Sequence, residues 1–99
     1  MPTPATYLDP RTLRLPVSRP GGADPAKLHR QIAQYGKSTV GMLPLFVFEA
    51  SDAELIFYDG VTRATRVAKL MPGSTVPVQI IGTVPELGAN YPTVQEKLP

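Results

Sequence analysis

Two apolar runs separated by a short polar turn constrain the fold of this chain more than any other feature of its sequence. Residues 43–49 are nearly all apolar, and residues 54–58 follow after the polar turn around Ser51-Asp52. This pattern is typical of an antiparallel β-hairpin. Directly after it, an apolar period of 3.6 residues predicts a short amphipathic helix that Pro72-Gly73 ends. The positions in that period are Ala64, Val67, Ala68 and Met71.

A strand and a helix are predicted before the hairpin. Apolar residues alternate with polar residues and a proline over 12–17, which predicts a short strand at a sheet edge, since proline lacks an amide donor. Its apolar positions are Leu13, Leu15 and Val17. Asp24-Pro25 predicts the start of a helix, because aspartate caps a first turn and proline fits its first position. Gly36 marks the end of this helix, and its apolar stripe is Leu28, Ile32 and Tyr35.

The remaining segments set the domain organisation. Residues 75–81 alternate apolar and polar side chains and predict a last strand. Residues 1–10 carry three prolines and little periodicity, so we expect a flexible lead-in. Residues 83–99 are a Pro-rich extension with one turn of helix expected over 92–97. Residues 11–82 therefore form one α+β domain, a small mixed sheet covered by two main helices.

Composition excludes several classes of function. Cysteine is absent, so thiol catalysis, disulfides and thiolate metal sites are excluded. The single histidine, His29, and scattered carboxylates offer no recognisable metal-ligand spacing, and we expect His29 to be a surface residue. The formal net charge is only +2. A protein that binds mainly the phosphate backbone of DNA is expected to carry a dense face of lysine and arginine, which this charge does not indicate. No apolar run approaches the ~18 residues that span a bilayer, so we expect a cytoplasmic protein without a membrane partner.

The residues around Gly60 predict an anion site. Asp59-Gly60 joins the second apolar run to the helix, and glycine permits a tight turn that exposes amide hydrogens at the helix start. Arg63 and Arg66 lie three residues apart and would share a helix face. Arginine hydrogen bonds of roughly 1.5–3 kcal/mol would outweigh the helix dipole, at about 0.3–1 kcal/mol. The alternative is that both arginines cover apolar surface with their stems.

Several short motifs follow one another in the order found in a known superfamily. In chain order they are Arg19-Pro20, Asp24-Pro25-Ala26-Lys27-Leu28, a paired strand, Gly60-Val61-Thr62-Arg63 and Thr75-Val76-Pro77-Val78. Over roughly residues 11–82 this order resembles the sulfiredoxin and ParB N-terminal superfamily, which includes ParB-like nuclease domains. The resemblance implies an α+β fold of the ParB or sulfiredoxin type.

The resemblance also implies a nucleotide site. The nucleotide contacts of the superfamily correspond to Lys27 on the first helix and Arg63 in the turn, with Gly60 supplying backbone. Further phosphate contacts are expected from Thr62, Arg66 and Arg19. The implied ligand is a nucleoside triphosphate, ATP or CTP, with Mg²⁺ as its companion. Arg19 with Gly21-Gly22 could form an anion-binding loop before the first helix. The simpler alternative is a flexible turn, which is the usual role of Pro-Gly-Gly.

The turn departs from the catalytic patterns of the superfamily. Sulfiredoxins have Gly-Cys-His-Arg where this chain has Gly60-Val61-Thr62-Arg63, so sulfinic-acid reduction is excluded. Val61 and Thr62 also replace the glutamate and first arginine of the Gly-Glu-Arg-Arg in ParB-type proteins and the two histidines of the Asp-Gly-His-His-Arg in kinase and nuclease members. Asp59 remains as a catalytic candidate that could hold metal or orient water. An aspartate before glycine is equally a common turn residue.

Two functions remain open from the sequence. The first is a nucleotide- or phosphate-binding domain, with phosphoryl transfer or phosphodiester hydrolysis as its chemistry and a nuclease acting on nucleic acid as a variant. The second is a non-catalytic protein- or DNA-interaction module that retains the fold. In that case Met42, Met71 and the Phe46/Phe48 strand would matter wherever they are exposed. The sequence leaves enzymatic activity and the oligomeric state open.

Overall fold

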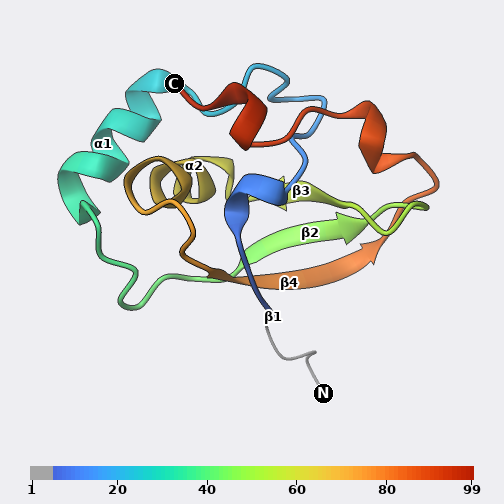
Figure 1. Cartoon of the computed structure of the whole chain (residues 1–99), viewed down its shortest axis with the longest axis horizontal. Coiled ribbons are helices and arrows are strands. Elements are labelled where there is room, and N and C mark those ends of the chain that lie inside the picture. The colour runs from blue at the N-terminus through green and yellow to red at the C-terminus, as the bar shows by residue number, and fades with distance from the viewer. Residues whose placement is uncertain (1–5) are drawn as a thin grey trace.

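The computed structural model describes residues 6–99, which form a four-stranded sheet with both α-helices on one face (Figure 1). The strands and α-helices are β1 (Thr6–Leu8), α1 (Pro25–Tyr35), β2 (Leu45–Glu49), β3 (Leu55–Asp59), α2 (Val61–Leu70) and β4 (Val76–Thr83). Three short 3₁₀ helices complete the described elements: η1 (Pro10–Thr12), η2 (Gly88–Asn90) and η3 (Gln95–Lys97). The expected α+β class is therefore confirmed.

The sheet is mixed, with the strand order β1-β4-β2-β3. β2 pairs antiparallel with β3, as the hairpin pattern predicts, and parallel with β4. A parallel neighbour requires a crossover, and α2 supplies it between β3 and β4. The last strand is confirmed, although it runs two residues beyond its expected end at Ile81. This topology places the start of α2 directly after the end of β3, which positions the Gly60 turn at one end of the sheet.

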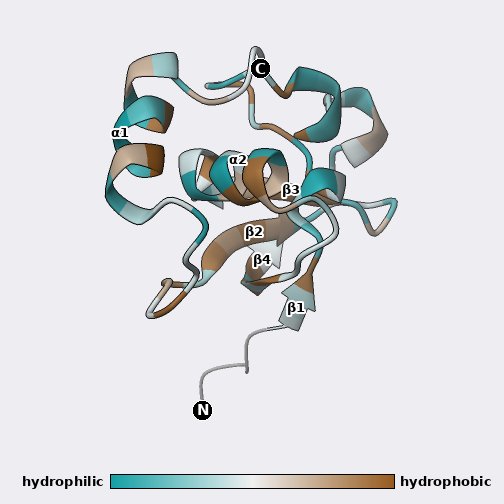
Figure 2. Cartoon of the chain, turned by 60° about the vertical axis from the view of Figure 1, so that its left-hand side comes forward, coloured by the Kyte–Doolittle hydropathy of each residue, from teal (hydrophilic) through white to brown (hydrophobic). Residues whose placement is uncertain are grey.

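The core lies between the inner face of the sheet and α2. Figure 2 shows the apolar strand β2 running beneath that helix. The expected apolar positions of α2 are buried, except that Met71 is only partly so. The central buried cluster comprises Leu13, Leu15, Leu45, Val47, Phe57, Ala64, Val67, Ala68, Val76, Val78 and Val94. No described member of this cluster comes from α1, whose one buried residue is Leu28 at 5% exposed, so that helix packs at the margin of the core.

Order begins earlier than the sequence predicts. Residues 6–8 form β1, which pairs antiparallel with Val76–Val78 of β4, so a flexible lead-in is wrong for residues 6–10. Residues 1–5 of that expected lead-in lie outside the described part of the chain. The physical reason is that β4 would otherwise present an open edge, and main-chain pairing with it outweighs the local proline content.

The predicted strand over 12–17 is wrong. Only Arg14 makes bridges there, one parallel to Ile56 and one antiparallel to Thr93. Asp9 caps a 3₁₀ turn just before it by accepting a hydrogen bond from the Arg11 amide at 3.0 Å, and Pro16 has no amide to continue a ladder. The alternation holds for burial only in part, because Leu13 and Leu15 are buried while Val17 is 76% exposed.

The C-terminal segment packs on the domain instead of extending from it. Val94 lies in the core cluster, and the Val84 amide donates to the Glu49 carbonyl at 2.9 Å. The helical turn expected over 92–97 is present as η3. Residues 83–99 thus close the end of the hairpin, which the Pro-rich composition alone did not indicate.

Asp52 ties the β2–β3 turn to this C-terminal segment. One of its carboxylate oxygens accepts from the Gly88 amide and the other from the Ala89 amide, both at 3.0 Å. The Glu54 amide also donates to it, at 3.2 Å. The hydrogen bonds from these amides lower the pKa of Asp52 below its usual value, and the bond from Ala89 has the largest effect. The ionised carboxylate is therefore the form that holds the two segments together.

We expect the stability that Asp52 contributes to disappear in acid. Its pKa is lower in the folded than in the unfolded state, so its contribution is complete above the unfolded pKa of about 3.9 and is lost as pH falls through the lowered folded pKa. The free energy of unfolding of wild type and Asp52→Asn, measured by urea titration between pH 7 and pH 2.5, should differ above pH 5 and converge toward pH 2.5. A difference that is independent of pH would contradict this role.

Candidate functional site

Six of the seven residues predicted for the site line one cavity between α1 and the start of α2. The cavity has a volume of about 280 Å³ and is called the phosphate cavity below, after the ligand that the sequence predicts for it. Its predicted members are Arg19, Lys27, Asp59, Gly60, Thr62 and Arg63, and its other lining residues are Pro16, Ser18, Gln31, Tyr58 and Val61. The turn before α1, the first turns of α1 and the β3–α2 corner thus meet at one place.

Gly60 makes the corner that brings α2 to the cavity. Its φ is +112°, in the left-handed region that glycine adopts without strain, and its carbonyl accepts the Ala64 amide at 2.9 Å to begin the helix. A Cβ at this position would lie 2.6 Å from Cδ2 of Leu45, a fully buried side chain. No side chain caps the first turn of α2, so its amides add positive potential beside the cavity.

Arg63 sits at the inner wall of the cavity with two long contacts. Its Nη1 donates to the Leu43 carbonyl at 3.2 Å, and its Nη2 lies 3.6 Å from Oδ2 of Asp59. The Arg63 side chain is 20% exposed and that of Asp59 is 65% exposed. Both distances exceed the roughly 2.7–2.9 Å of a strong charge-assisted hydrogen bond, so the guanidinium retains capacity for a better partner.

Lys27 and Arg19 contribute the other two positive charges. Asp24 caps α1 as predicted, accepting the Lys27 amide at 3.0 Å, and this fixes the first turn that carries the Lys27 side chain. Both side chains belong to exposed residues, and neither forms an ion pair with any of residues 6–99. Exposed ammonium and guanidinium groups without a carboxylate partner are typical of a surface that attracts anions from solution.

Contrary to the prediction, Arg66 does not line the phosphate cavity with Arg63, but lines an adjoining cavity that Arg63 also lines. It is 2% exposed, and its Nη1 donates to the carbonyls of Gly36 at 2.7 Å and Ser38 at 2.9 Å. Its guanidinium lies 5.4 Å from the ring centroid of Tyr35. Burial lowers the pKa of Arg66, which nevertheless stays charged at neutral pH. Its fixed hydrogen bonds give it a structural role, holding the segment after α1 against α2.

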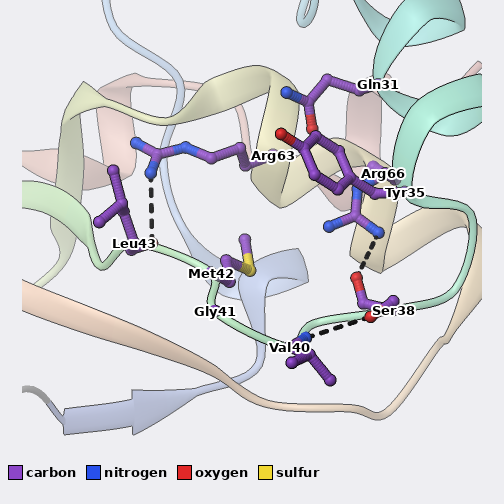
Figure 3. Close-up of a pocket in the computed structure, with 9 residues that line it drawn as sticks. All are labelled: Gln31, Tyr35, Ser38, Val40, Gly41, Met42, Leu43, Arg63 and Arg66. Atoms are coloured by element: carbon purple, nitrogen blue, oxygen red, sulfur yellow. Dashed lines mark hydrogen bonds between the residues drawn. The ribbon is translucent and has the colours of Figure 1, made fainter.

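A second cavity, of about 250 Å³, adjoins the first, and Gln31 and Arg63 line both (Figure 3). It is called the Tyr35 recess below, and its other lining residues are Tyr35, Ser38, Val40, Gly41, Met42, Leu43 and Arg66. In Figure 3 the Met42 side chain points into the recess, whereas that of Val40 points away from it. Two buried polar atoms in its walls have no hydrogen-bond partner among the described residues, Oε1 of Gln31 and Nε of Arg66.

Gln31 and Tyr35 are functional candidates that the sequence reasoning missed. The signal was available in the helical period, because Lys27, Gln31 and Tyr35 follow one another at intervals of four and so share one face of α1. Tyr35 had been placed on the apolar stripe with Leu28 and Ile32, yet it is 45% exposed and lines the recess. Met42 could not have been assigned, since it lies in the irregular segment between α1 and β2.

Over residues 6–99 no cluster of three or more histidine, aspartate or glutamate side chains is arranged to hold a metal ion. None of the helices in the same residues has the length and apolar character needed to cross a bilayer. Comparison with known protein families, characterised proteins and solved structures finds no significant match to this chain. The resemblance to the sulfiredoxin and ParB superfamily therefore stays a prediction from sequence motifs.

Proposed function

We propose that this domain binds a nucleotide, or another phosphate ester, through the phosphate cavity. The observation that carries the proposal is that cationic side chains from three separate segments, Arg19, Lys27 and Arg63, line one cavity beside an uncapped helix start. Charged donors that converge from different elements are preorganised for an anion, and the helix start adds a favourable potential.

Asp59, the carboxylate in the cavity, can give up Arg63 to a phosphate group. Asp59 faces Arg63 across 3.6 Å while remaining largely exposed, so this ion pair is weak in water. Two oxygens of a phosphate group would give Arg63 shorter, bidentate hydrogen bonds and leave Asp59 to turn toward a cation. Mg²⁺ is commonly held by one or two carboxylates together with substrate phosphates, and Asp59 suits that role. The bound metal would supply neutralisation of phosphate charge.

The Tyr35 recess favours a nucleotide over free phosphate. It opens beside the phosphate cavity, shares Gln31 and Arg63 with it, and has the apolar wall of Met42 and the ring of Tyr35. A base that entered it would bury apolar surface and could pair with the side-chain amide of Gln31 after a rotation that exposes its buried oxygen. Hydrolysis or phosphoryl transfer would require Asp59 to orient the attacking water, which makes Asp59 the catalytic candidate of the proposal.

Nucleotide binding should raise the melting temperature of the wild type. A ligand at 100 times its dissociation constant stabilises a protein by about 2.7 kcal/mol, which is a shift of roughly 10–20 °C for a domain of this size. ATP, CTP and a short single-stranded oligonucleotide, each with Mg²⁺, are the probes. Lys27→Ala and Arg63→Ala should abolish the shift, whereas Arg30→Ala, the same loss of charge outside this cavity, should keep it.

A second candidate function follows from the outer face of the sheet. The helices cover the inner face (Figure 1). Tyr7 of β1 and Tyr58 of β3, on the two edge strands of the sheet, are 66% and 65% exposed, and Phe48 meets Tyr58 edge to face at 5.6 Å. An exposed aromatic surface is typical of a protein-interaction module. If no nucleotide shifts the melting temperature at millimolar concentration and the protein associates during size-exclusion chromatography, this alternative replaces the first.

A further inference from the structure

A third cavity lies along a different face of α1 and has the largest volume of those along this helix, about 430 Å³ among the described residues. It is called the basic groove below. Its lining residues are Gly21, Ala23, Pro25, Leu28, His29, Ile32, Lys69, Lys97 and Pro99. It shares none of them with the phosphate cavity or the Tyr35 recess, so it is a separate site.

The floor of the groove is the apolar face of α1. Leu28 and Ile32, one turn apart, line it together with Pro25. This helix is amphipathic, yet none of its residues belongs to the central buried cluster. Leu28 is buried, at 5% exposed, while Ile32 is only partly covered and Pro25 is exposed. An amphipathic helix normally gains its stability by burying its apolar face against a core. Here part of that face is turned to an open groove, which leaves apolar area for a ligand to cover.

The rim of the groove is cationic. Lys69 of α2 and Lys97 of η3 stand on the side opposite α1, and His29 lies on the helix itself. No side-chain carboxylate lines the groove within residues 6–99, and neither lysine forms an ion pair with a described side chain. Lys69 donates to the main-chain oxygen of Pro99 at 2.9 Å, so one of its three N–H donors is already engaged in the groove and two remain for a ligand. A ligand complementary to this surface would have an apolar chain and one negatively charged end.

We propose that the basic groove binds an amphiphilic monocarboxylate of the fatty-acid class. The aliphatic chain lies on Leu28, Ile32 and Pro25, and the carboxylate meets the ammonium groups of Lys69 and Lys97. The volume of the groove falls within the roughly 300–1,000 Å³ of small-molecule sites. A protein partner would need about 800 Å² of surface on each side, which favours a small ligand here. This site is independent of the proposed nucleotide function.

Chain length and head-group charge test the proposal directly. Hexanoate, octanoate and decanoate are titrated into the ¹⁵N-labelled wild-type protein below their micelle-forming concentrations. Amide shifts are expected at residues 21–32, at Lys69 and at Lys97, with binding that tightens about fourfold for each added methylene. Decyltrimethylammonium, which has the same chain with a positive end, should bind at least tenfold more weakly than decanoate.

Matched variants separate the groove from general surface charge. Lys69→Glu/Lys97→Glu should weaken decanoate binding at least tenfold, whereas Arg30→Glu/Lys37→Glu, with the same change of net charge outside the groove, should not. Ile32→Gln, which leaves the lysines in place, should flatten the dependence on chain length. Shifts confined to the outer face of the sheet, equal binding of decanoate and decyltrimethylammonium, or no binding of decanoate at millimolar concentration would each overturn the proposal.

Discussion

Replacing Gly60 by alanine is expected to lower the free energy of unfolding by about 3 kcal/mol, because two costs coincide at this residue. Its φ of +112° costs a non-glycine residue roughly 1–2 kcal/mol. The new Cβ would also lie 2.6 Å from Cδ2 of Leu45, whose side chain is fully buried. Forcing an extra carbon into a packed core typically costs a further ~1–3 kcal/mol. Urea unfolding followed by far-UV circular dichroism measures the change.

Gly73→Ala is the matched control for this substitution. Gly73 also has a positive φ, +91°, but an added Cβ there meets nothing within 4 Å. It should therefore cost only the backbone strain, about 1 kcal/mol. The difference between the two variants isolates the contact between the Gly60 corner and the core. Equal losses in both variants would show that Leu45 moves aside freely and that the corner is not tightly packed.

Replacing Arg66 by alanine is expected to cost about 3 kcal/mol, since it removes hydrogen bonds and packing together. The buried guanidinium holds the carbonyls of Gly36 and Ser38, and it packs against Tyr35. Hydrogen bonds to charged groups contribute roughly 1.5–3 kcal/mol each, offset in part by the cost of burying the charge. Hydrogen exchange should rise in residues 37–43, because their first turn loses its attachment to α2.

The variant Arg66→Met separates the loss of hydrogen bonds from the loss of packing. Methionine fills similar volume without donors, so it should recover about 1 kcal/mol of packing and leave the loss from the two carbonyls. Arg30→Met, at an exposed position of α1, is the control for removal of a positive charge and should be nearly neutral. If Arg66→Met were as stable as wild type, the hydrogen bonds to Gly36 and Ser38 would contribute nothing net.

The sequence predicted those elements whose signals are local. The hairpin, both helices, the Asp24 cap, the Gly36 end and the last strand follow from short-range patterns, and the structure contains them all. The strand expected over 12–17 failed because alternation reports burial, and Leu13 and Leu15 are buried without belonging to a ladder. β1 and the packing of residues 83–99 depend on partners far along the chain, which no local pattern encodes.

The candidate site divides in the same way. The residues flanking Gly60 come together because the chain itself connects them, and the helix cap fixes where Lys27 emerges. Arg66 separates from Arg63 because their helical offset of three residues is about 60° short of a full turn. One guanidinium meets the carbonyl of Leu43 and the other meets that of Gly36 after α1. The Tyr35 recess required knowledge of how the segment 36–44 folds over α2, and its irregular backbone has no periodic signal.

The short segment around Arg14 has a consequence for how this protein behaves in concentrated solution. Its main chain lies between β3 and the C-terminal segment, bonding to Leu55 and Phe57 on one side while its neighbours Leu13 and Leu15 bond to Val94 and Pro92 on the other. The outermost strand of the hairpin is thereby closed to foreign strands over these residues. A variant shortened before Pro92 would leave the main chain of Leu13 and Leu15 without its partners on that side. We expect such a variant to self-associate through this open edge and to end in fibrous aggregates.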